Sequence, residues 1–302
     1  MPADVLRWPR IRPGDRVRLV SPASWPPADW LADAARVLTG WGLRVEAGAH
    51  ALDRRGYLAG RDRDRLADLN DAFRDPGVRG IVATRGGAGA YRIVDGIDVD
   101  AVRADPKPVV GFSDITNLHL ALWARCGLPT VHGCLSGSDA VRTARRLLTT
   151  DEPVTVRRDP AAPLADVVVP GRATGRLLGG NLSALVGFVG AGLPDLTGAL
   201  LCIEDNRCGA DPLRLDAHLA QLSGSGALAG VRGIALGDLG PAGSDADRAA
   251  VAAVCRDRFG ALGVPVLAGL PFGHLPDQTC LPLGAPAVLD TTAGTLTTAV
   301  RR

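Results

Sequence analysis

Ser113 is the residue of this chain whose type and setting point most directly to chemistry. It lies in segment 106–125, PKPVVGFSDITNLHLALWAR, where a short apolar run is followed by residues at helical spacing. This change of period predicts a buried strand, a tight turn and a helix, with the serine at the turn. Such a turn exposes the hydroxyl beside the free N–H groups of a helix start, as nucleophile elbows do. Gly111 supplies the small residue before the serine, but Ile115 replaces the second glycine of the G-x-S-x-G pattern.

A serine nucleophile needs a base to accept its proton and a carboxylate to orient that base. Of the five histidines, His119 and His218 fall in helical patterns and His50 lies in a loop, so we expect these three to pack, cap or face solvent. His132 and His274 follow strands or turns and are next to glycine. Both remain candidates for the base, and a structural histidine bonded to the backbone is the alternative for either one.

Glu204 is the carboxylate that the sequence favours. The chain has only three glutamates among its 32 acidic residues, and Glu204 follows the apolar run 198–203. A carboxylate at the end of a buried strand lies either at the protein's rim or in a cleft at the carboxyl edge of the sheet. Asp114 follows Ser113 directly and is predicted to cap the helix that starts there.

The glycine-rich loop 85–91, RGGAGAY, has two interpretations. A phosphate cradle is the weaker one, because Arg92 stands where the dinucleotide fingerprint needs its third glycine. An oxyanion hole suits the loop better, since backbone N–H groups freed by adjacent glycines can face a substrate oxygen. Gly86 or Gly87 would then share this task with the N–H of Asp114.

The elements that must position these residues alternate between strand and helix in the first half of the chain. This alternation predicts a mostly parallel sheet covered on both faces, with ligand sites at the carboxyl ends of its strands. Both the glycine loop and Ser113 follow predicted strands. The expected strands cover residues 16–21, 43–47, 80–84 and 108–112, and helices are expected at residues 29–39 and within segment 56–73.

The second half predicts a smaller, mixed α/β domain. We place the N-terminal domain at residues 1–148, a proline- and valine-rich linker at 149–171, and the C-terminal domain at 172–302. Segment 176–191 is interpreted as a glycine turn followed by a helix, and segment 285–300 as a hairpin around Ala293 and Gly294.

Composition excludes several classes of protein. With 302 residues, of which 46% are hydrophobic, the chain can fill a sizeable core, and a net charge of +2 favours neither nucleic acid nor an anionic membrane as partner. The charged N-terminus and the lack of a long apolar run predict a cytoplasmic protein. The six cysteines form no C-x-x-C pair, so buried thiols are expected, with no metal site and no cofactor.

Nine segments, in this order and at this spacing, resemble the LD-carboxypeptidase family of serine peptidases, which includes the microcin C immunity peptidases. The resemblance covers most of the chain. It is carried by residues 12–24, 56–73, 83–92, 106–122, 130–133, 177–185, 200–206, 267–274 and 281–290.

The resemblance implies a Ser-Glu-His triad made of Ser113 in GFSD, Glu204 in IED and His274 in GH, and so favours His274 over His132. It also implies oxyanion donors from the N–H of Asp114 and a glycine of loop 85–89. The family's fold has an α/β N-terminal domain that carries the serine, a C-terminal domain that carries the other two residues, and usually a homodimeric assembly.

The function that this resemblance implies is hydrolysis of an L,D-amide bond, which releases a terminal D-alanine from a muropeptide during cell-wall recycling. The substrate would be a small peptide, and Arg85 is a candidate for binding its terminal carboxylate. An immunity peptidase that cleaves a peptidyl-nucleotide antibiotic is the alternative within the family. An alternative of another class is a non-catalytic α/β protein that binds a small molecule at the glycine loop.

Overall fold

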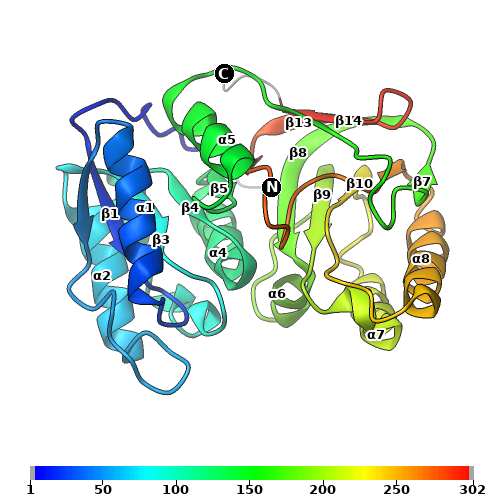
Figure 1. The fold of residues 1–302 in the computed structure, drawn as a ribbon, viewed down its shortest axis with the longest axis horizontal. Helices are drawn as coiled ribbons and strands as arrows, with labels where there is room; N and C mark the ends of the chain where they lie inside the picture. The colour runs from blue at the N-terminus through cyan, green and yellow to red at the C-terminus, as the bar shows by residue number, and fades with distance from the viewer. Residues whose placement is uncertain (1–3, 299–302) are drawn as a thin grey trace. The chain divides into compact units, whose positions relative to one another are not determined.

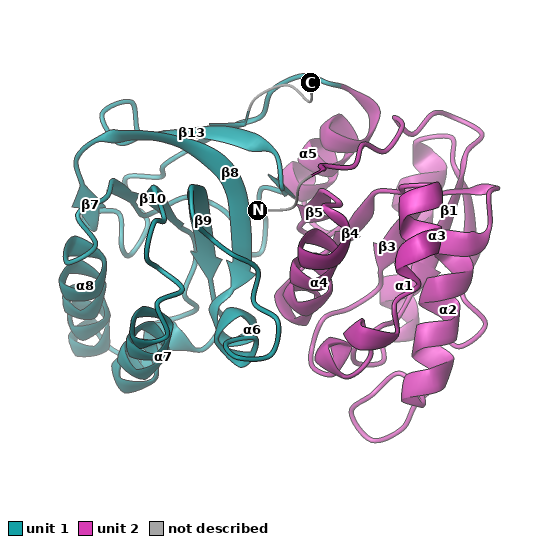
Figure 2. Ribbon diagram, turned by 180° about the vertical axis from the view of Figure 1, so that it is seen from behind, with its two compact units in different colours: residues 1, 151–302 teal, residues 2–150 magenta. Residues whose placement is uncertain are grey.

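The computed structural model describes residues 4–298 (Figure 1). The chain forms two compact units, an N-terminal unit of residues 2–150 and a C-terminal unit of residues 151–302 (Figure 2). Each unit has its own sheet and its own buried apolar residues. The strands within segment 149–171, β6 (Thr155–Arg157) and β7 (Val168–Val169), both pair with strands of the C-terminal unit.

The N-terminal unit is built on a parallel sheet, as the alternating pattern predicted. Its strands lie in the order β5-β4-β3-β1-β2, and each neighbouring pair is parallel. The central strands are short Val- and Ile-rich runs, as expected of strands that are buried on both faces. Their bounds are β1 (Arg16–Val20), β2 (Arg44–Ala47), β3 (Val78–Ala83), β4 (Val109–Gly111) and β5 (Thr130–His132).

Helices connect these strands. The predicted apolar face of α2 buries Leu69 and Phe73, whereas most of α4 is buried. Three short 3-10 turns, η1 (Ala90–Arg92), η2 (Val94–Gly96) and η3 (Ser113–Ile115), follow strand ends or link helices. The helices are α1 (Ala28–Gly40), α2 (Asp62–Arg74), α3 (Val99–Ala104), α4 (Thr116–Cys126) and α5 (Ser138–Thr149).

Lys107, the only lysine of the chain, closes the end of α2. Its side chain is fully buried, and Nζ donates to the carbonyl oxygens of Ala72 (2.9 Å), Phe73 (2.6 Å) and Asp75 (2.7 Å). Burial lowers the pKa of Lys107. The last carbonyls of a helix have no partner within the helix, and a cation there also complements the helix dipole. A compact ammonium with three donors fits three converging carbonyls better than the planar fork of arginine does.

Lys107→Met is therefore expected to lower the free energy of unfolding by about 2–4 kcal/mol, because three carbonyls lose their donor and two of these hydrogen bonds are buried. Lys107→Arg is expected to be destabilising as well. Urea unfolding monitored by circular dichroism checks both. Stability equal to that of the wild type in both variants would contradict this account of the α2 end.

The C-terminal unit contains a mixed sheet, as predicted. Its strand order is β6-β14-β13-β8-β9-β10-β11-β7, in which β8, β9, β10 and β11 are parallel and the outer strands are antiparallel. The predicted hairpin is formed by β13 and β14, although residues 299–300 of that segment lie outside the described residues. The remaining strand bounds are β8 (Arg172–Asn181), β9 (Ala199–Glu204), β10 (Gly233–Leu236), β11 (Val266–Leu267), β12 (Leu281–Leu283), β13 (Pro286–Asp290) and β14 (Thr295–Thr298).

Three helices accompany this sheet, and α7 packs between α6 and α8 (Figure 1). They are α6 (Leu182–Gly187), α7 (Pro212–Gly224) and α8 (Asp245–Gly260), and a 3-10 turn, η4 (Cys208–Ala210), precedes α7. Five of the six cysteines are buried and the sixth, Cys134, is partly buried; all six are free thiols.

The glycine turn predicted within segment 176–191 is wrong. Residues 176–181 are the last part of the ten-residue strand β8, and only the helix α6 that follows was anticipated correctly. Gly179 lies in this strand at φ +122°, where a Cβ would collide with the carbonyl oxygen of Cys202 on β9. A glycine in a strand can mark such a close approach of two backbones as well as a turn.

Candidate active site

Ser113 occupies a strained position between β4 and α4. Its φ is +62°, and it is the only non-glycine residue with positive φ within residues 4–298. Left-handed backbone costs an L-residue free energy, and such strain occurs mostly at functional sites. At Gly111, a Cβ would come within 2.7 Å of the Ile115 side chain. The elbow predicted from the sequence is therefore formed, and Gly111 is the small residue that it requires.

The glycine loop lies directly against this elbow. A Cβ on Gly86 would be 2.8 Å from the Ser113 Cβ, 2.9 Å from the Phe112 carbonyl oxygen and 3.2 Å from the Asp114 nitrogen. Neither Gly86 nor Gly87 donates its backbone N–H to an acceptor in the described part of the chain. The structure thus places Gly86 against the serine and leaves the N–H groups of both glycines without an acceptor, as an oxyanion hole requires.

Two side chains hold the loop in place. Ser24 Oγ accepts a hydrogen bond from the Ala88 N–H (3.1 Å), and the Ser24 N–H donates to the Gly86 carbonyl (3.1 Å). The Asp114 carboxylate accepts from the Ala90 N–H (2.8 Å) and from the Asn117 side chain (2.9 Å). Burial raises the pKa of Asp114, and these hydrogen bonds oppose that effect.

The prediction that Asp114 caps α4 is therefore wrong. Asp114 lies inside the 3-10 turn η3, and its carboxylate bonds to the backbone of residue 90 rather than to the first N–H groups of α4. No side-chain hydrogen bond caps the start of α4. Asp114 instead connects the elbow to the glycine loop.

Gly86→Ala tests the contact between loop and elbow. The added methyl group would overlap the Ser113 Cβ, so we expect kcat to fall at least about 100-fold, since a displacement of about 1 Å at an active site can cost that much. Gly40→Ala is the matched control, because Gly40 lies in α1 with nothing within 4 Å of its Cβ position. Steady-state kinetics measure kcat of both variants. Equal kcat values for Gly86→Ala and Gly40→Ala would contradict the contact between the loop and the elbow.

Two histidines of the N-terminal unit, His119 and His132, are buried. His119 Nε2 donates to the Gly111 carbonyl (2.8 Å), and burial lowers the pKa of His119 to about 4, so the ring is neutral at pH 7. His132, in β5, is fully buried, and its ring lies 6.2 Å from the rings of Phe112 and His119.

Arg85 begins the glycine loop and is half-buried. Its Nη1 donates to the Trp25 carbonyl (2.8 Å), and its guanidinium lies 5.6 Å from the ring centres of both Trp25 and Trp30. Within residues 4–298, no salt bridge joins Arg85 to a carboxylate. Its charge is therefore held beside the loop without an internal counterion.

Glu204 and His274 are joined within the C-terminal unit. Glu204 is the last residue of β9 and is fully buried, and its Oε2 accepts a hydrogen bond from Nδ1 of His274 at 2.6 Å. His274 keeps 18% of its side chain exposed. A histidine held at Nδ1 by a carboxylate presents Nε2 for proton transfer, which is the arrangement of a base and its orienting group.

The acidic groups around His274 change its pKa. Burial lowers the pKa of His274, but the hydrogen bond to Glu204 and the nearby Glu204, Asp205 and Asp238 carboxyl groups outweigh it, so the pKa lies above its ordinary value. Burial raises the pKa of Glu204, and the contact with His274 works against that change.

Two residues that support Glu204 were not predicted. Asn181 ends β8 directly opposite Glu204 in the parallel register, and its side chain helps to lower the Glu204 pKa. Gly273, at φ +108°, packs on Glu204, where a Cβ would be 2.8 Å from the Glu204 Cβ. The contact of Asn181 with Glu204 follows from the register of β8 and β9. For Gly273, the only sequence signal was the G-H pair that it forms with His274.

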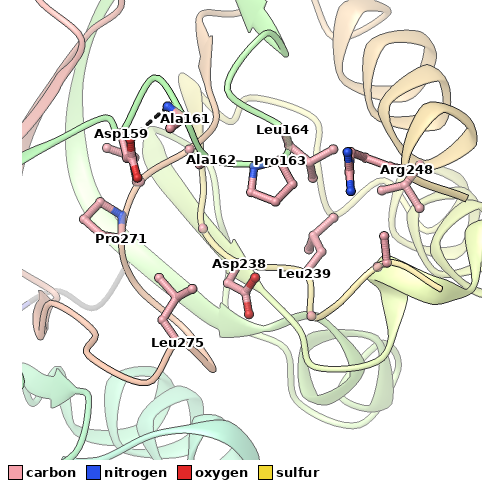
Figure 3. Close-up of a pocket in the computed structure, with 17 residues that line it drawn as sticks. Asp159, Ala161, Ala162, Pro163, Leu164, Asp238, Leu239, Arg248, Pro271 and Leu275 are labelled. Atoms are coloured by element: carbon pink, nitrogen blue, oxygen red, sulfur yellow. Dashed lines mark hydrogen bonds between the residues drawn. The ribbon is translucent and has the colours of Figure 1, made fainter. Parts of the chain in front are cut away.

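A cavity of about 230 Å³ opens beside the strand ends of the C-terminal unit (Figure 3). Its walls come from the segments after β10 and β11 and from loop 159–164, and they include Leu275, the residue after His274. Asp238, whose carboxyl group contributes to the raised His274 pKa, also lines it. The lining is mostly apolar, and the volume suits a small side chain rather than a whole peptide.

Two groups of side chains could each offer three metal ligands within 4.8 Å of one another. Asp205, Cys208 and His218 form the first, but the Asp205 carboxylate already accepts hydrogen bonds from Ser183 and the Arg207 N–H. Burial and, to a lesser extent, the Arg214 guanidinium lower the pKa of His218, and this guanidinium is an unfavourable neighbour for a cation. The second group is His50, Asp53 and Asp64, in which Asp53 is exposed.

The predicted site residues thus fall into two groups. Ser113, Asp114, Gly86, Gly87 and Arg85 lie together in the N-terminal unit. Glu204 and His274 lie together in the C-terminal unit.

A strained serine at a strand-to-helix turn, with a glycine loop against it, is a feature of serine hydrolases that act on acyl groups. Two family models identify the class further: the LD-carboxypeptidase N-terminal domain matches residues 17–133, and the LD-carboxypeptidase C-terminal domain matches residues 174–289. The chain belongs to the LD-carboxypeptidase family of serine peptidases. In the described part of the chain, no helix is both long and apolar enough to cross a lipid bilayer.

Two proteins named as carboxypeptidases match this chain over nearly its whole length. A Streptomyces coelicolor protein named as a carboxypeptidase is 41% identical over 97% of this chain and 96% of its own length. A Bacillus subtilis protein named as a murein peptide carboxypeptidase is 35% identical over 93% of this chain and 90% of its own length.

Solved structures agree with the fold. An MccF-like protein from Bacillus anthracis matches with a TM-score of 0.85 at 24% identity, over 97% of this chain and 99% of that one. A muramoyltetrapeptide carboxypeptidase from Oxalobacter formigenes matches with a TM-score of 0.82 at 26% identity, over 95% and 99% of the two chains.

Proposed function

We propose that this protein is a serine carboxypeptidase that hydrolyses the L,D-amide bond of a muramoyl tetrapeptide and releases the terminal D-alanine. The observation that carries the proposal is Ser113 itself, a strained elbow serine with Gly86 packed against it, in a loop where the N–H groups of Gly86 and Gly87 have no acceptor among the described residues. The names of the relatives and of the Oxalobacter structure support the choice of substrate.

In the proposed reaction Ser113 Oγ attacks the carbonyl carbon of the L-residue while His274 Nε2 accepts the serine proton. The oxyanion receives hydrogen bonds from the N–H groups of Asp114 and of Gly86 or Gly87. The C–N bond then breaks as His274 gives the proton to the leaving amine of D-alanine. Water attacks the ester in the second half of the reaction, with His274 again as base.

Glu204 holds His274 through Nδ1 and stabilises the imidazolium that forms in each step. The 2.6 Å hydrogen bond and the complete burial of Glu204 support this role. The ring of His132, the other candidate, packs against Phe112 and His119. We therefore favour His274 as the base.

Arg85 is proposed to bind the terminal carboxylate of the substrate. It starts the loop that supplies the oxyanion donors, and it has no counterion within residues 4–298. A guanidinium binds a carboxylate through two parallel hydrogen bonds, which suits recognition of a chain end.

A substrate panel tests the proposed function. Purified enzyme is incubated with each of four substrates: a muramoyl tetrapeptide that ends in D-alanine, one that ends in L-alanine, the D-alanine tetrapeptide with its C-terminal carboxylate blocked as an amide, and a peptidyl adenylate. The products are measured by mass spectrometry. We expect D-alanine release from the first substrate alone. Cleavage of the adenylate with none of the tetrapeptides would favour an immunity peptidase, and no cleavage of any substrate would contradict peptidase activity.

Homodimer formation is also proposed, and sedimentation velocity tests it.

A further inference from the structure

Arg65, near the start of α2, is the only fully buried arginine within residues 4–298. A guanidinium loses much hydration free energy when it is buried, and a buried ion pair adds little net stability compared with an apolar side chain of the same size. The Arg65 Nε also has no hydrogen-bond partner in the described part of the chain. The burial of this charge therefore requires an explanation other than stability of the core.

The Arg65 guanidinium joins three segments of the N-terminal unit. Its Nη1 donates to the carbonyl oxygens of Gly89 (3.0 Å) and Pro22, and its Nη2 donates to Oδ1 of Asp62 (2.6 Å). Pro22 follows β1, and Gly89 lies in the glycine loop after β3. Because a guanidinium is planar and its donors point in fixed directions, it holds these two carbonyls in a fixed relation to each other.

The segment that Arg65 binds at residue 22 is also the one that binds the glycine loop. The Ser24 N–H donates to the Gly86 carbonyl (3.1 Å), and Ser24 Oγ accepts from the Ala88 N–H (3.1 Å). Arg65 thus fixes the loop twice, directly at Gly89 and through Ser24 at Gly86 and Ala88. Since Gly86 packs against the elbow serine, a shift of the loop would reach the serine directly.

The counterion of Arg65 extends these contacts to the far end of the loop. Asp62 accepts a hydrogen bond from Arg65 and further ones from Nε (3.0 Å) and Nη2 (2.7 Å) of Arg92, the last residue of η1. Arg92 and, to a lesser extent, Arg65 lower the pKa of Asp62 to about 2, so this carboxylate is ionised at pH 7. The start of α2 is therefore attached to the chain on both sides of the loop.

Arg65 also acts on Asp114, the residue after the serine. The Asp114 carboxylate accepts from the Ala90 N–H (2.8 Å), next to the Gly89 carbonyl that Arg65 binds. Burial raises the pKa of Asp114, and the Ala90 hydrogen bond and then the Arg65 charge oppose this effect. Arg65 therefore favours the ionised carboxylate that accepts this hydrogen bond from the loop.

We propose that Arg65 is a positioning residue for the oxyanion hole. By holding the carbonyls of Pro22 and Gly89, it fixes the loop whose N–H groups at Gly86 and Gly87 face the oxyanion. This inference rests on the proposed function, which assigns the loop to an oxyanion hole. Fixed donors stabilise charge that develops only in the transition state, so loss of Arg65 should lower kcat and leave KM nearly unchanged.

The test compares wild-type enzyme with Arg65→Met, which donates no hydrogen bond, and Arg65→Lys, which keeps the charge without the planar fork. The probe is a tripeptide boronic acid, in which boron replaces the attacked carbonyl carbon, bonds to Ser113 Oγ and becomes tetrahedral and anionic. In Arg65→Met we expect kcat for D-alanine release to fall at least about 100-fold and the inhibition constant of the boronic acid to rise at least about tenfold, with KM within about threefold of the wild type. Arg65→Lys should lie between the two in kcat and in inhibition constant.

Arg125→Met is the matched control. Arg125 is a partly buried arginine of the same unit that also donates to backbone carbonyls, those of Val94 (2.6 Å) and Ile97 (3.4 Å), outside the glycine loop. Its replacement should leave kcat and the inhibition constant within about twofold of the wild type, because the oxyanion donors stay in place. Urea unfolding of all variants separates a loss of stability from a loss of position.

An unchanged inhibition constant in folded Arg65→Met would overturn the proposal, and so would a rise in KM that accounts for the whole loss of kcat/KM. If neither Arg65 variant folds, Asp62→Asn decides, since the Asp62 side chain is 38% exposed and its replacement leaves Arg65 in the chain without its counterion. The inhibition constant should then rise at least about threefold. The same constant as in the wild type would overturn the positioning role.

Labelling with a fluorophosphonate distinguishes this proposal from the proposed function, because it needs no peptide substrate. Its phosphonyl oxygen requires the same donors as the oxyanion when the adduct with Ser113 forms. If the wild type is labelled at Ser113 but cleaves no muramoyl peptide, the proposed substrate is wrong. A labelling rate at least about tenfold lower in Arg65→Met than in Arg125→Met would still support the positioning role, and equal rates would overturn it.

Discussion

Ser113→Ala is expected to lower kcat for D-alanine release by about 10⁴–10⁶-fold, because the groups of a catalytic triad act as a unit and removal of the nucleophile leaves only binding and oxyanion stabilisation. Single-turnover release of D-alanine, measured by mass spectrometry, checks this. Activity within tenfold of the wild type would exclude Ser113 as the nucleophile.

The strain at Ser113 provides a control that activity alone does not. Alanine keeps the Cβ that makes φ +62° unfavourable, whereas glycine removes it. We expect Ser113→Gly to be about 1 kcal/mol more stable than Ser113→Ala although both are inactive, because strain of this kind costs on the order of 1–3 kcal/mol. Urea unfolding measures the difference. A less stable glycine variant would mean that the elbow is not strained.

Glu204→Gln is expected to lower kcat by about 10³–10⁴-fold. The amide keeps the shape of the side chain but can hold the His274 ring in the wrong tautomer and cannot stabilise its charge. The matched control is Glu46→Gln, since Glu46 is a half-exposed glutamate that pairs with Arg16 and Arg18. Steady-state kinetics should show near wild-type activity for the control.

The same variant should also change the pH dependence. His274 must be neutral to accept a proton, so kcat/KM should fall as the pH drops through its pKa. In the wild type that pKa lies above the ordinary value of a histidine, because the contacts with Glu204 and the nearby carboxyl groups outweigh burial. Glu204→Gln removes the largest effect that raises the pKa, and the acid limb should move to lower pH. If the acid limb of the pH profile does not move, Glu204 does not act on the pKa of the catalytic base.

Much of the fold could be predicted because hydrophobic periodicity directly reports burial. The alternation of strands and helices defined the parallel sheet of the N-terminal unit, and the small and β-branched residues of the tail defined the hairpin of β13 and β14. The segment around Gly179 failed because glycine is ambiguous: it permits turns, but here it permits the close approach of β8 and β9.

Contacts distant in sequence explain the other differences. Asp114 accepts its hydrogen bond from Ala90, 24 positions earlier, so local capping preferences could not reveal its role. Asn181 meets Glu204 through the register of β8 and β9, which local sequence patterns do not report. Lys107 had one sequence signal, as the sole lysine among 34 basic residues, but only the structure shows the three carbonyls that it binds.

The most direct test of the central claim is covalent labelling of the enzyme with a fluorophosphonate, followed by peptide mass spectrometry. If Ser113 is a nucleophile activated by His274, one adduct should form on Ser113, and its rate of formation should fall at least about 100-fold in His274→Ala and as the pH is lowered. An adduct on another residue, or labelling of Ser113 at the same rate without His274, would contradict the account.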